Sequence, residues 1–313
     1  MVFANLLIYI VSFAAILFGA GLILSSADRF SKRLRVSSFA FSFFVLGILT
    51  SIPEFGIGMN AIAEGRPGIF VGNLIGGILV IFILIIPIFA ILGNGIKLQH
   101  KLDSKRLLFS FFVMLSPAFL ILDGKITKIE GVLMIVLYAF LFYFIQREKG
   151  IFDTERNSLL DVKAYSFKDI VKVLIGIGII FVSSNLIVDK TIYFADVFKI
   201  SPYYISLVLL SVGTNLPELS LAIRSVMLKK KDVAFGDYVG SGSANVFLFG
   251  IFTVLNTNEV LTDDNFFVTF LIMAVALGLV YYFLRLKNDI TREEGIFLLL
   301  LYIFFVIIEG VGG

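Results

Sequence analysis

The chain has 313 residues, of which 59% are hydrophobic and 16% charged, and its mean hydropathy of +1.01 excludes an ordinary soluble domain. With no cysteine and one histidine, His100, it cannot build a disulfide, a thiolate metal centre or a histidine-based triad. The net charge of +3 comes from short loops between apolar runs and not from a basic face, which argues against nucleic-acid binding. These properties predict a polytopic membrane protein.

A transmembrane helix needs about 20 apolar residues, and ten runs of roughly this length follow one another along the chain. They cover 2–26, 37–62, 69–92, 107–123, 129–145, 169–188, 203–227, 235–255, 265–284 and 295–312. The runs are unbroken rather than alternating, which favours helices over barrel strands of about 9–11 residues. We therefore expect an all-α polytopic membrane protein with ten transmembrane helices and no soluble domain.

The loops between these runs indicate an orientation. Lys and Arg number 19 in the odd-numbered loops and 5 in the even-numbered loops. Because basic residues accumulate in cytoplasmic loops, the odd-numbered loops are predicted to face the cytoplasm. Both termini are then outside, and we expect a multi-pass protein of the plasma (cell) membrane.

The longest loop divides the chain into two halves. Residues 1–146 form a first membrane unit of five spans, 147–168 a cytoplasmic linker, and 169–313 a second unit of five spans. Since each unit has an odd number of spans, the second enters the membrane from the opposite side. This is the condition for two inverted-topology repeats.

One short motif occurs in both halves. It reads TSIPE at 50–54 and TNLPE at 214–218, and each copy falls in the second span of its half. The register that matches Thr50 with Thr214 continues without a gap into the third span of each half. It matches Gly72 with Gly236 and Gly76 with Gly240. An internal repeat is thus predicted to carry the chemistry.

The Pro-Glu pair of each motif is costly within a membrane. Proline donates no backbone N–H and frees a carbonyl one turn earlier, beside Thr50 in one copy and Thr214 in the other. The next residues, Glu54 and Glu218, would together cost about 5–7 kcal/mol if left unpaired at the centre of a bilayer. Each therefore needs a proton or a cation. The alternative is a pair of kinked structural helices whose glutamates are protonated or paired with Arg224.

Carboxylate, hydroxyl, amide and carbonyl oxygens are hard ligands, which suit Ca²⁺ or Na⁺ better than soft transition metals. Two carboxylates balance the charge of one Ca²⁺, or they hold a small number of Na⁺ ions. Because both ions would need the same glutamates, their binding is competitive. Competition at a site that opens to one side of the membrane at a time produces exchange instead of a leak.

Together with the segments GNLIGG (72–77) and GDYVGSGSAN (236–245), the two pentapeptides resemble the paired alpha repeats of the sodium/calcium exchanger family, within the cation/calcium exchanger superfamily. The predicted ten spans, inverted halves and outside termini extend the resemblance over the whole chain. It implies that spans 2, 3, 7 and 8 surround the ions and that spans 1 and 6 slide across this core. It also implies exchange of cytosolic Ca²⁺ for external Na⁺.

The resemblance also implies roles for individual residues. Glu54 and Glu218 match the paired Ca²⁺ ligands of the family, and Thr50 and Thr214 match its carbonyl donors. Four further residues match positions that line its Na⁺ sites. These are Ser51, Asn215, Ser241 and Asn245.

The chain also departs from the family pattern. Gly77 stands where the first repeat usually has Ser, and Ile81 where it usually has Asn or Asp. In the second repeat, Asn245 replaces the common Asp and Asn215 the common Ser. The loss of two oxygen donors from the first repeat leaves the Na⁺ stoichiometry and the counter-ion open. We expect Asp237 to be a solvated residue at a helix start rather than an additional carboxylate near an ion path.

The sequence thus favours an antiporter that moves Ca²⁺ against Na⁺, and not an enzyme. A Ca²⁺/H⁺ exchanger is the first alternative, because both glutamates can carry protons, and K⁺ is a further candidate ion. A cation channel built on the same repeat is less well supported. Apart from the transported ions and the lipid bilayer, we expect no cofactor, no nucleic acid and no obligate protein partner.

Overall fold

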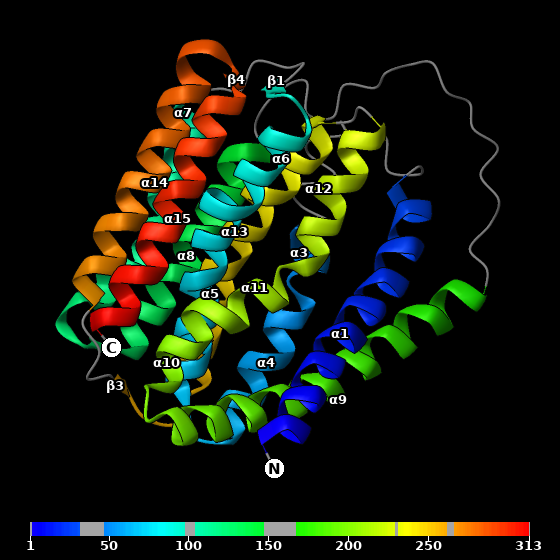
Figure 1. Ribbon diagram of the computed structural model, residues 1–313, viewed down its shortest axis with the longest axis vertical. Coiled ribbons are helices and arrows are strands. Elements are labelled where there is room, and N and C mark those ends of the chain that lie inside the picture. Colours follow the sequence, from blue (N-terminus) through cyan, green and yellow to red (C-terminus); the bar gives the residue numbers. More distant parts are fainter. Residues whose placement is uncertain are drawn as a thin grey trace.

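The computed structural model describes residues 2–31, 47–97, 104–146, 167–228, 231–261 and 266–312, and nearly all of them are helical (Figure 1). Within this described part, seven helices are long and apolar enough to cross a membrane. They are Val2–Leu22, Pro67–Leu92, Ser104–Asp123, Lys128–Ile145, Ile170–Phe198, Ala234–Leu255 and Phe266–Lys287. Each coincides with one of the ten predicted runs.

The three remaining predicted runs are also helical where they are described, but each is shortened or carries more charge. Run 37–62 begins outside the described residues and continues as α3 (Gly47–Thr50) and α4 (Ile52–Ala63). Run 203–227 is divided into several short helices. They are α10 (Pro202–Ile205), the π-helix η4 (Ser206–Leu210), α11 (Ser211–Thr214) and α12 (Leu216–Leu228). Run 295–312 lies in α15 (Arg292–Gly312), which includes Glu293, Glu294 and Glu309.

Two long helices, α1 (Val2–Ser31) and α9 (Phe167–Phe198), lie side by side along one flank of the bundle (Figure 1). Their backbones approach closely at Gly19, where an added Cβ would lie 2.9 Å from the carbonyl oxygen of Gly176. Helix α4 packs against α9. Small residues at such crossings allow the close backbone approach that stabilises helix pairs in lipid.

The centre of the bundle is formed by two nearly buried helical segments. One is α5 (Pro67–Val80), which continues through the π-helix η2 (Ile81–Ile85) into α6 (Ile86–Leu92), and the other is α13 (Lys231–Leu255). Helix α5 packs on α10, η4 and α11, while α13 packs on α3 and α4. The glycine matches of the repeat lie at these crossings. An added Cβ at Gly76 would lie 2.1 Å from the carbonyl oxygen of Leu207, and one at Gly47 would lie 2.6 Å from the carbonyl carbon of Gly240.

The remaining helices cover the other side of the centre. Helix α7 (Ser104–Leu120), followed by the 3₁₀ turn η3 (Ile121–Asp123), packs on α8 (Lys128–Gln146), on α13 and on α14 (Phe266–Lys287). Helix α15 packs on α6 and α14. Two short antiparallel strand pairs join the loops. Ile96–Lys97 (β1) pairs with Asp289–Ile290 (β4), and Lys125–Ile126 (β2) pairs with Val260–Leu261 (β3).

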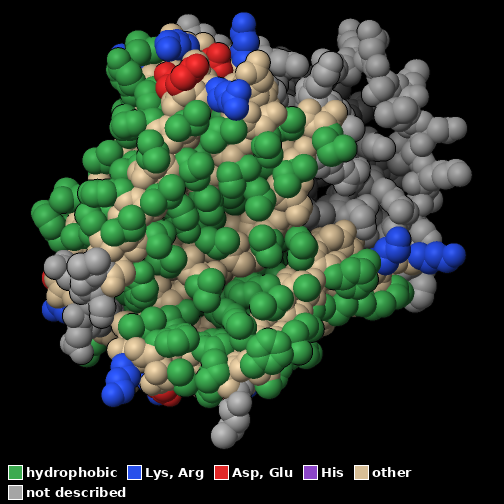
Figure 2. All heavy atoms as spheres, viewed as in Figure 1, with side chains coloured by type: hydrophobic (Ala, Val, Ile, Leu, Met, Phe, Trp, Pro, Cys, Tyr) green, Lys and Arg blue, Asp and Glu red, His purple; other side chains and the backbone are tan. Residues whose placement is uncertain are grey.

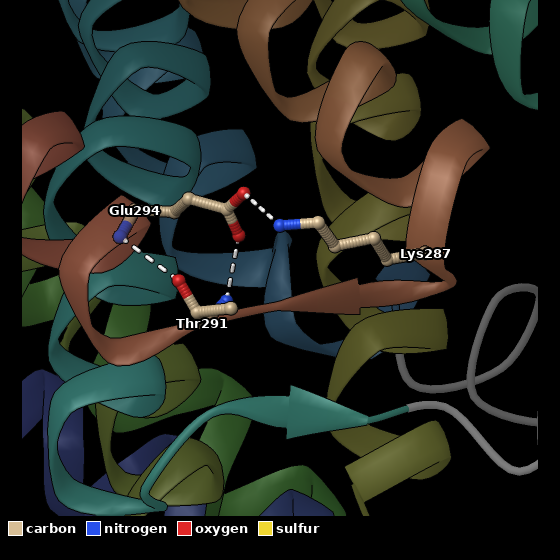
Figure 3. A network of polar contacts seen from close by, with 3 residues as sticks. All are labelled: Lys287, Thr291 and Glu294. Carbon is tan, nitrogen blue, oxygen red and sulfur yellow. Dashed lines mark hydrogen bonds and ion pairs between the residues drawn. The ribbon is translucent and has the colours of Figure 1, made fainter.

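Helices α8 and α15 begin with the same capping box, in which a Thr and a Glu three residues later bond to each other's backbone N–H. The N–H of Thr291 donates to the Glu294 carboxylate at 2.8 Å, and the N–H of Glu294 donates to the Thr291 hydroxyl at 3.2 Å (Figure 3). The Nζ of Lys287 lies 3.4 Å from the same carboxylate. Thr127 and Glu130 make the equivalent bonds at 2.8 and 3.3 Å.

The surface is that of a membrane protein. Figure 2 shows hydrophobic side chains over most of the visible face, with the charged side chains gathered toward its ends and edges. Large apolar residues such as Phe112, Val182 and Leu300 have more than half of their surface exposed. Exposed apolar surface of this extent is unfavourable in water and is expected where side chains meet lipid. The protein is therefore an integral, multi-pass membrane protein.

Candidate cation-binding site

Both pentapeptides interrupt a helix as predicted. Helix α3 ends at Thr50 and α4 begins at Ile52, so that Ser51 is not helical. In the second half, α11 ends at Thr214 and α12 begins at Leu216, with Asn215 at the break. The cause is local, because the proline of each motif follows two residues after the break and has no N–H with which to continue the preceding helix.

The two breaks place Glu54 and Glu218 in the first turns of α4 and α12, where the helix dipole favours a negative charge. Their exposed fractions are 1% and 0%. The carboxylates interact with each other, and each lies next to the threonine of the other half, Glu54 by Thr214 and Glu218 by Thr50. The prediction that the two glutamates converge is therefore consistent with the structure.

These carboxylates have unused hydrogen-bonding capacity. Both oxygens of Glu54 and Oε2 of Glu218 have no hydrogen-bond partner, although they are buried. Leaving a buried charged oxygen without a partner is costly. The side chain of Arg224, the basic residue considered above as a partner, lies outside the described part. The two glutamates thus keep three buried acceptor oxygens without a hydrogen-bond partner.

The serine residues of the predicted set lie beside Glu218. The hydroxyl of Ser241 donates to Oε1 of Glu218 at 2.8 Å, and the Oγ atoms of Ser241 and Ser51 are 3.5 Å apart. Ser51 also donates to the carbonyl oxygen of Gly47 at 2.8 Å. Ser51 belongs to the first half of the chain and Ser241 to the second, so both halves contribute hydroxyl oxygens to one cluster.

The two asparagines of the predicted set lie together on the side of Gly77. Nδ2 of Asn215 donates to the carbonyl oxygen of Ser211 at 2.8 Å, and Nδ2 of Asn245 donates to that of Leu74 at 3.5 Å. Both Oδ1 atoms are buried without a partner. An added Cβ at Gly77 would lie 2.7 Å from Nδ2 of Asn245 and 3.1 Å from Nδ2 of Asn215. The missing serine at position 77 thus leaves space that the two carboxamides occupy.

The other departure, Ile81, is fully buried at the start of η2 and adds an apolar side chain to the centre of the bundle. The internal repeat matches it with Asn245, which carries a carboxamide at the equivalent position of the second half. The two halves therefore contribute different numbers of side-chain oxygens to the cluster.

The expectation that Asp237 is solvated at a helix start is wrong. Helix α13 begins at Lys231, and Asp237 is fully buried within it. Its Oδ1 accepts a hydrogen bond from the hydroxyl of Thr50 at 3.3 Å. Asn73, at the equivalent position of the first half, accepts a bond from the hydroxyl of Thr214 at 3.1 Å. The repeat itself was the available signal, because it aligns Asp237 with Asn73, which lies within the long apolar run 69–92.

A bundle of apolar helices encloses carboxylate, carboxamide and hydroxyl oxygens, several of them without partners. These features define the class as integral membrane proteins with a candidate internal cation site. Among the described residues, no three acidic or histidine side chains surround one metal position. The candidate site combines the carboxylates of Glu54 and Glu218 with neutral oxygens, a set of groups that is typical of ligands for hard cations.

Within this class, the chain belongs to the sodium/calcium exchanger protein family, whose model matches residues 4–146 and 168–310. It is 26% identical to the sodium/calcium exchanger MaX1 of Methanosarcina acetivorans, over 98% of this chain and 99% of that protein. It is 23% identical to the inner membrane protein YrbG of Escherichia coli, over 79% and 81% of the two chains.

Among solved structures, the fold is similar to that of the sodium–calcium exchanger NCX_Mj. The TM-score is 0.71 at 24% identity, and the match covers 98% of this chain and 99% of that one. The family resemblance inferred from the two pentapeptides is confirmed.

Proposed function

We propose that this protein is a secondary active antiporter that exchanges Ca²⁺ for Na⁺ by alternating access. The observation that carries the proposal is the pair of buried carboxylates, Glu54 and Glu218, which come from the two halves and retain three oxygens without a hydrogen-bond partner. Hard oxygen ligands and a formal charge of two fit one Ca²⁺ or a small number of Na⁺ ions. The names of the relatives MaX1 and NCX_Mj support the same pair of ions.

The proposal includes the architecture of ten helices in two inverted repeats of five. The register that matches Thr50 with Thr214 also matches the first residue of α5, Pro67, with the first residue of α13, Lys231. The two segments that the family model covers begin and end in the same register. In this register β1 corresponds to β3 and β2 corresponds to β4, so the strand pair β1–β4 is equivalent to the pair β3–β2. Strands β1 and β3, which hold equivalent residues, lie at opposite ends of the molecule (Figure 1). Inverted repeats are expected to behave in this way.

The same proposal places the β1–β4 end in the cytoplasm and both termini outside, in the plasma membrane. Both chain ends lie away from the β1–β4 end (Figure 1), and the loops richest in Lys and Arg are the odd-numbered ones. The linker 147–168 falls outside the described residues. Helices α1 and α9 would move against the central helices, because they pack along each other at the flank of the bundle.

A second candidate is Ca²⁺/H⁺ exchange. It is favoured by Gly77 and Ile81, which supply no side-chain oxygen where the second half has Ser241 and Asn245. Fewer oxygens reduce the number of Na⁺ ions that the site can hold, whereas a proton needs only one carboxylate oxygen.

One experiment separates the candidates. The purified protein is reconstituted in liposomes, and Ca²⁺ uptake is measured while Na⁺, K⁺ and proton gradients are imposed one at a time. Uptake driven by an outward Na⁺ gradient at constant pH is expected. Uptake that ignores Na⁺ and follows pH would instead establish the second candidate, and net Ca²⁺ current without any counter-ion would identify a channel.

A further inference from the structure

Asp237 is a third buried carboxylate that the function proposed above does not use. Its side chain is fully buried, and its Oδ2 has no hydrogen-bond partner. The groups that interact with it are the hydroxyl of Thr50, which donates to Oδ1 at 3.3 Å, the carboxylates of Glu218 and Glu54, and the neighbouring phenol of Tyr238. Among these described contacts none is a cation, and Glu218 has the same sign of charge.

The first half of the chain contains a neutral copy of this arrangement. Asn73 is matched with Asp237 by the internal repeat, is equally buried, and accepts a hydrogen bond from Thr214 at 3.1 Å. A carboxamide oxygen is therefore sufficient for the bond to the threonine hydroxyl. What Asp237 adds is a negative charge, and a negative charge inside a membrane protein needs a compensating cation.

One divalent cation between Glu54 and Glu218 would balance two of the three negative charges, so the charge of Asp237 needs a further cation. The described residues contain no position at which three acidic side chains surround a single metal. Asp237 interacts electrostatically with both glutamates, and the hydroxyl of Thr50 lies next to both Asp237 and Glu218. The carboxylate balances a single positive charge, and the neighbouring hydroxyl supplies a neutral oxygen.

We propose that Asp237 and Thr50 form an additional binding position for a monovalent alkali cation, next to Glu218, which is occupied together with a divalent cation at Glu54 and Glu218. The second part of this statement rests on the proposed function. Three carboxylates are neutralised by one divalent and one monovalent cation, and the exchanger would then require a monovalent cation on the side from which Ca²⁺ is taken.

The test compares the wild-type protein with Asp237→Asn, which copies Asn73 and keeps the hydrogen bond to Thr50. Binding of ²²Na⁺ and of ⁸⁶Rb⁺, as a probe for K⁺, is measured on the purified protein at saturating Ca²⁺. We expect the wild type to bind one Na⁺ or Rb⁺ per chain and Asp237→Asn to bind none, while ⁴⁵Ca²⁺ binding is retained. The two isotopes distinguish Na⁺ from K⁺ as the occupant.

Equal monovalent binding by both proteins, or none by the wild type, would overturn the proposal. Asp237→Glu keeps the charge and is expected to restore binding, which separates loss of charge from misfolding. If the wild type binds no Ca²⁺, the proposed function fails. The comparison in Ca²⁺-free buffer then still tests Asp237, because the variant should bind one monovalent cation fewer than the wild type, and an equal number would refute its role.

Discussion

Nδ2 of Asn60 on α4 lies 3.1 Å from the hydroxyl oxygen of Ser184 on α9, and Oδ1 of Asn60 accepts a weaker bond from Asn185 at 3.4 Å. This contact joins the helix that carries Glu54 to one of the two long helices at the flank. Gly56 permits it, since an added Cβ there would lie 2.8 Å from the Ser184 hydroxyl. The contact is one-sided, because the positions that correspond to Ser184 and Asn185 in the first half are an alanine and a glycine.

Asn60→Ala is expected to loosen α4 from α9. A hydrogen bond of this kind contributes about 0.5–1.5 kcal/mol, so removing it should reduce the population in which α4 and α9 are in contact roughly two- to tenfold. Because the chain has no cysteine, Ser51→Cys provides a single thiol in the site. Its labelling by a thiol reagent in the detergent-purified protein should become faster, because loosening α4 from α9 exposes Ser51→Cys more often. Ser110→Ala, which removes a hydroxyl bonded within its own helix, is the control, and an unchanged rate in Asn60→Ala would contradict the prediction.

Glu54→Gln and Glu218→Gln should each abolish Ca²⁺ uptake into proteoliposomes while the protein remains folded. The amide keeps the shape of the side chain but removes one of the two charges that balance a divalent cation. Glu64→Gln changes an exposed carboxylate at the end of α4 and should transport like the wild type. Near-normal uptake by both buried variants would show that the ion binds elsewhere.

Gly77→Ala should lower the thermal stability of the purified protein. The new methyl group would lie 2.7 Å from Nδ2 of Asn245, and overpacking of this kind costs about 1–3 kcal/mol. Asn245→Ser removes the obstructing carboxamide, and the double variant should recover part of the loss, with a coupling energy of about 0.5–3 kcal/mol. Strictly additive losses would mean that the two residues do not share this space.

Ile81→Asn should strengthen the dependence of Ca²⁺ uptake on Na⁺. The change places a carboxamide at the position equivalent to Asn245, in a fully buried site at the start of η2, and so supplies an additional oxygen near the cluster. The measurement is the apparent Na⁺ affinity of exchange, with Ile81→Leu as the apolar control. The same Na⁺ affinity in both variants would count against the view that the first half lacks a Na⁺ ligand.

Much of the candidate site could be inferred because the sequence repeats. The pentapeptides indicated where the helices break, since proline acts on its own backbone, and the register of the repeat paired Glu54 with Glu218. Asp237 was misinterpreted because burial depends on where a helix begins. With the span placed at 235, Asp237 was expected to be a solvated residue at a helix start, but α13 begins at Lys231 and Asp237 is fully buried within it.

Gly77 shows a second limit of sequence reasoning. In isolation its missing side chain indicates a lost ligand, whereas the structure shows two carboxamides from the second half of the chain in the vacant space. Such compensation depends on contacts between residues that belong to different halves of the chain. The number and orientation of the membrane crossings stay predictions, since they rest on loop charges and on the repeat.

The close contact of α1 and α9 at Gly19 and Gly176 bears on whether ions can leak through the protein. With a backbone carbonyl 2.9 Å from where a methyl group would stand, α1 and α9 have little freedom to shift separately, and we expect them to travel as one rigid body. A movement of this helix pair that exposes the glutamates to one side of the membrane would then close them off from the other side at the same time. Under this constraint, a continuous water path through the protein would require the two helices to come apart.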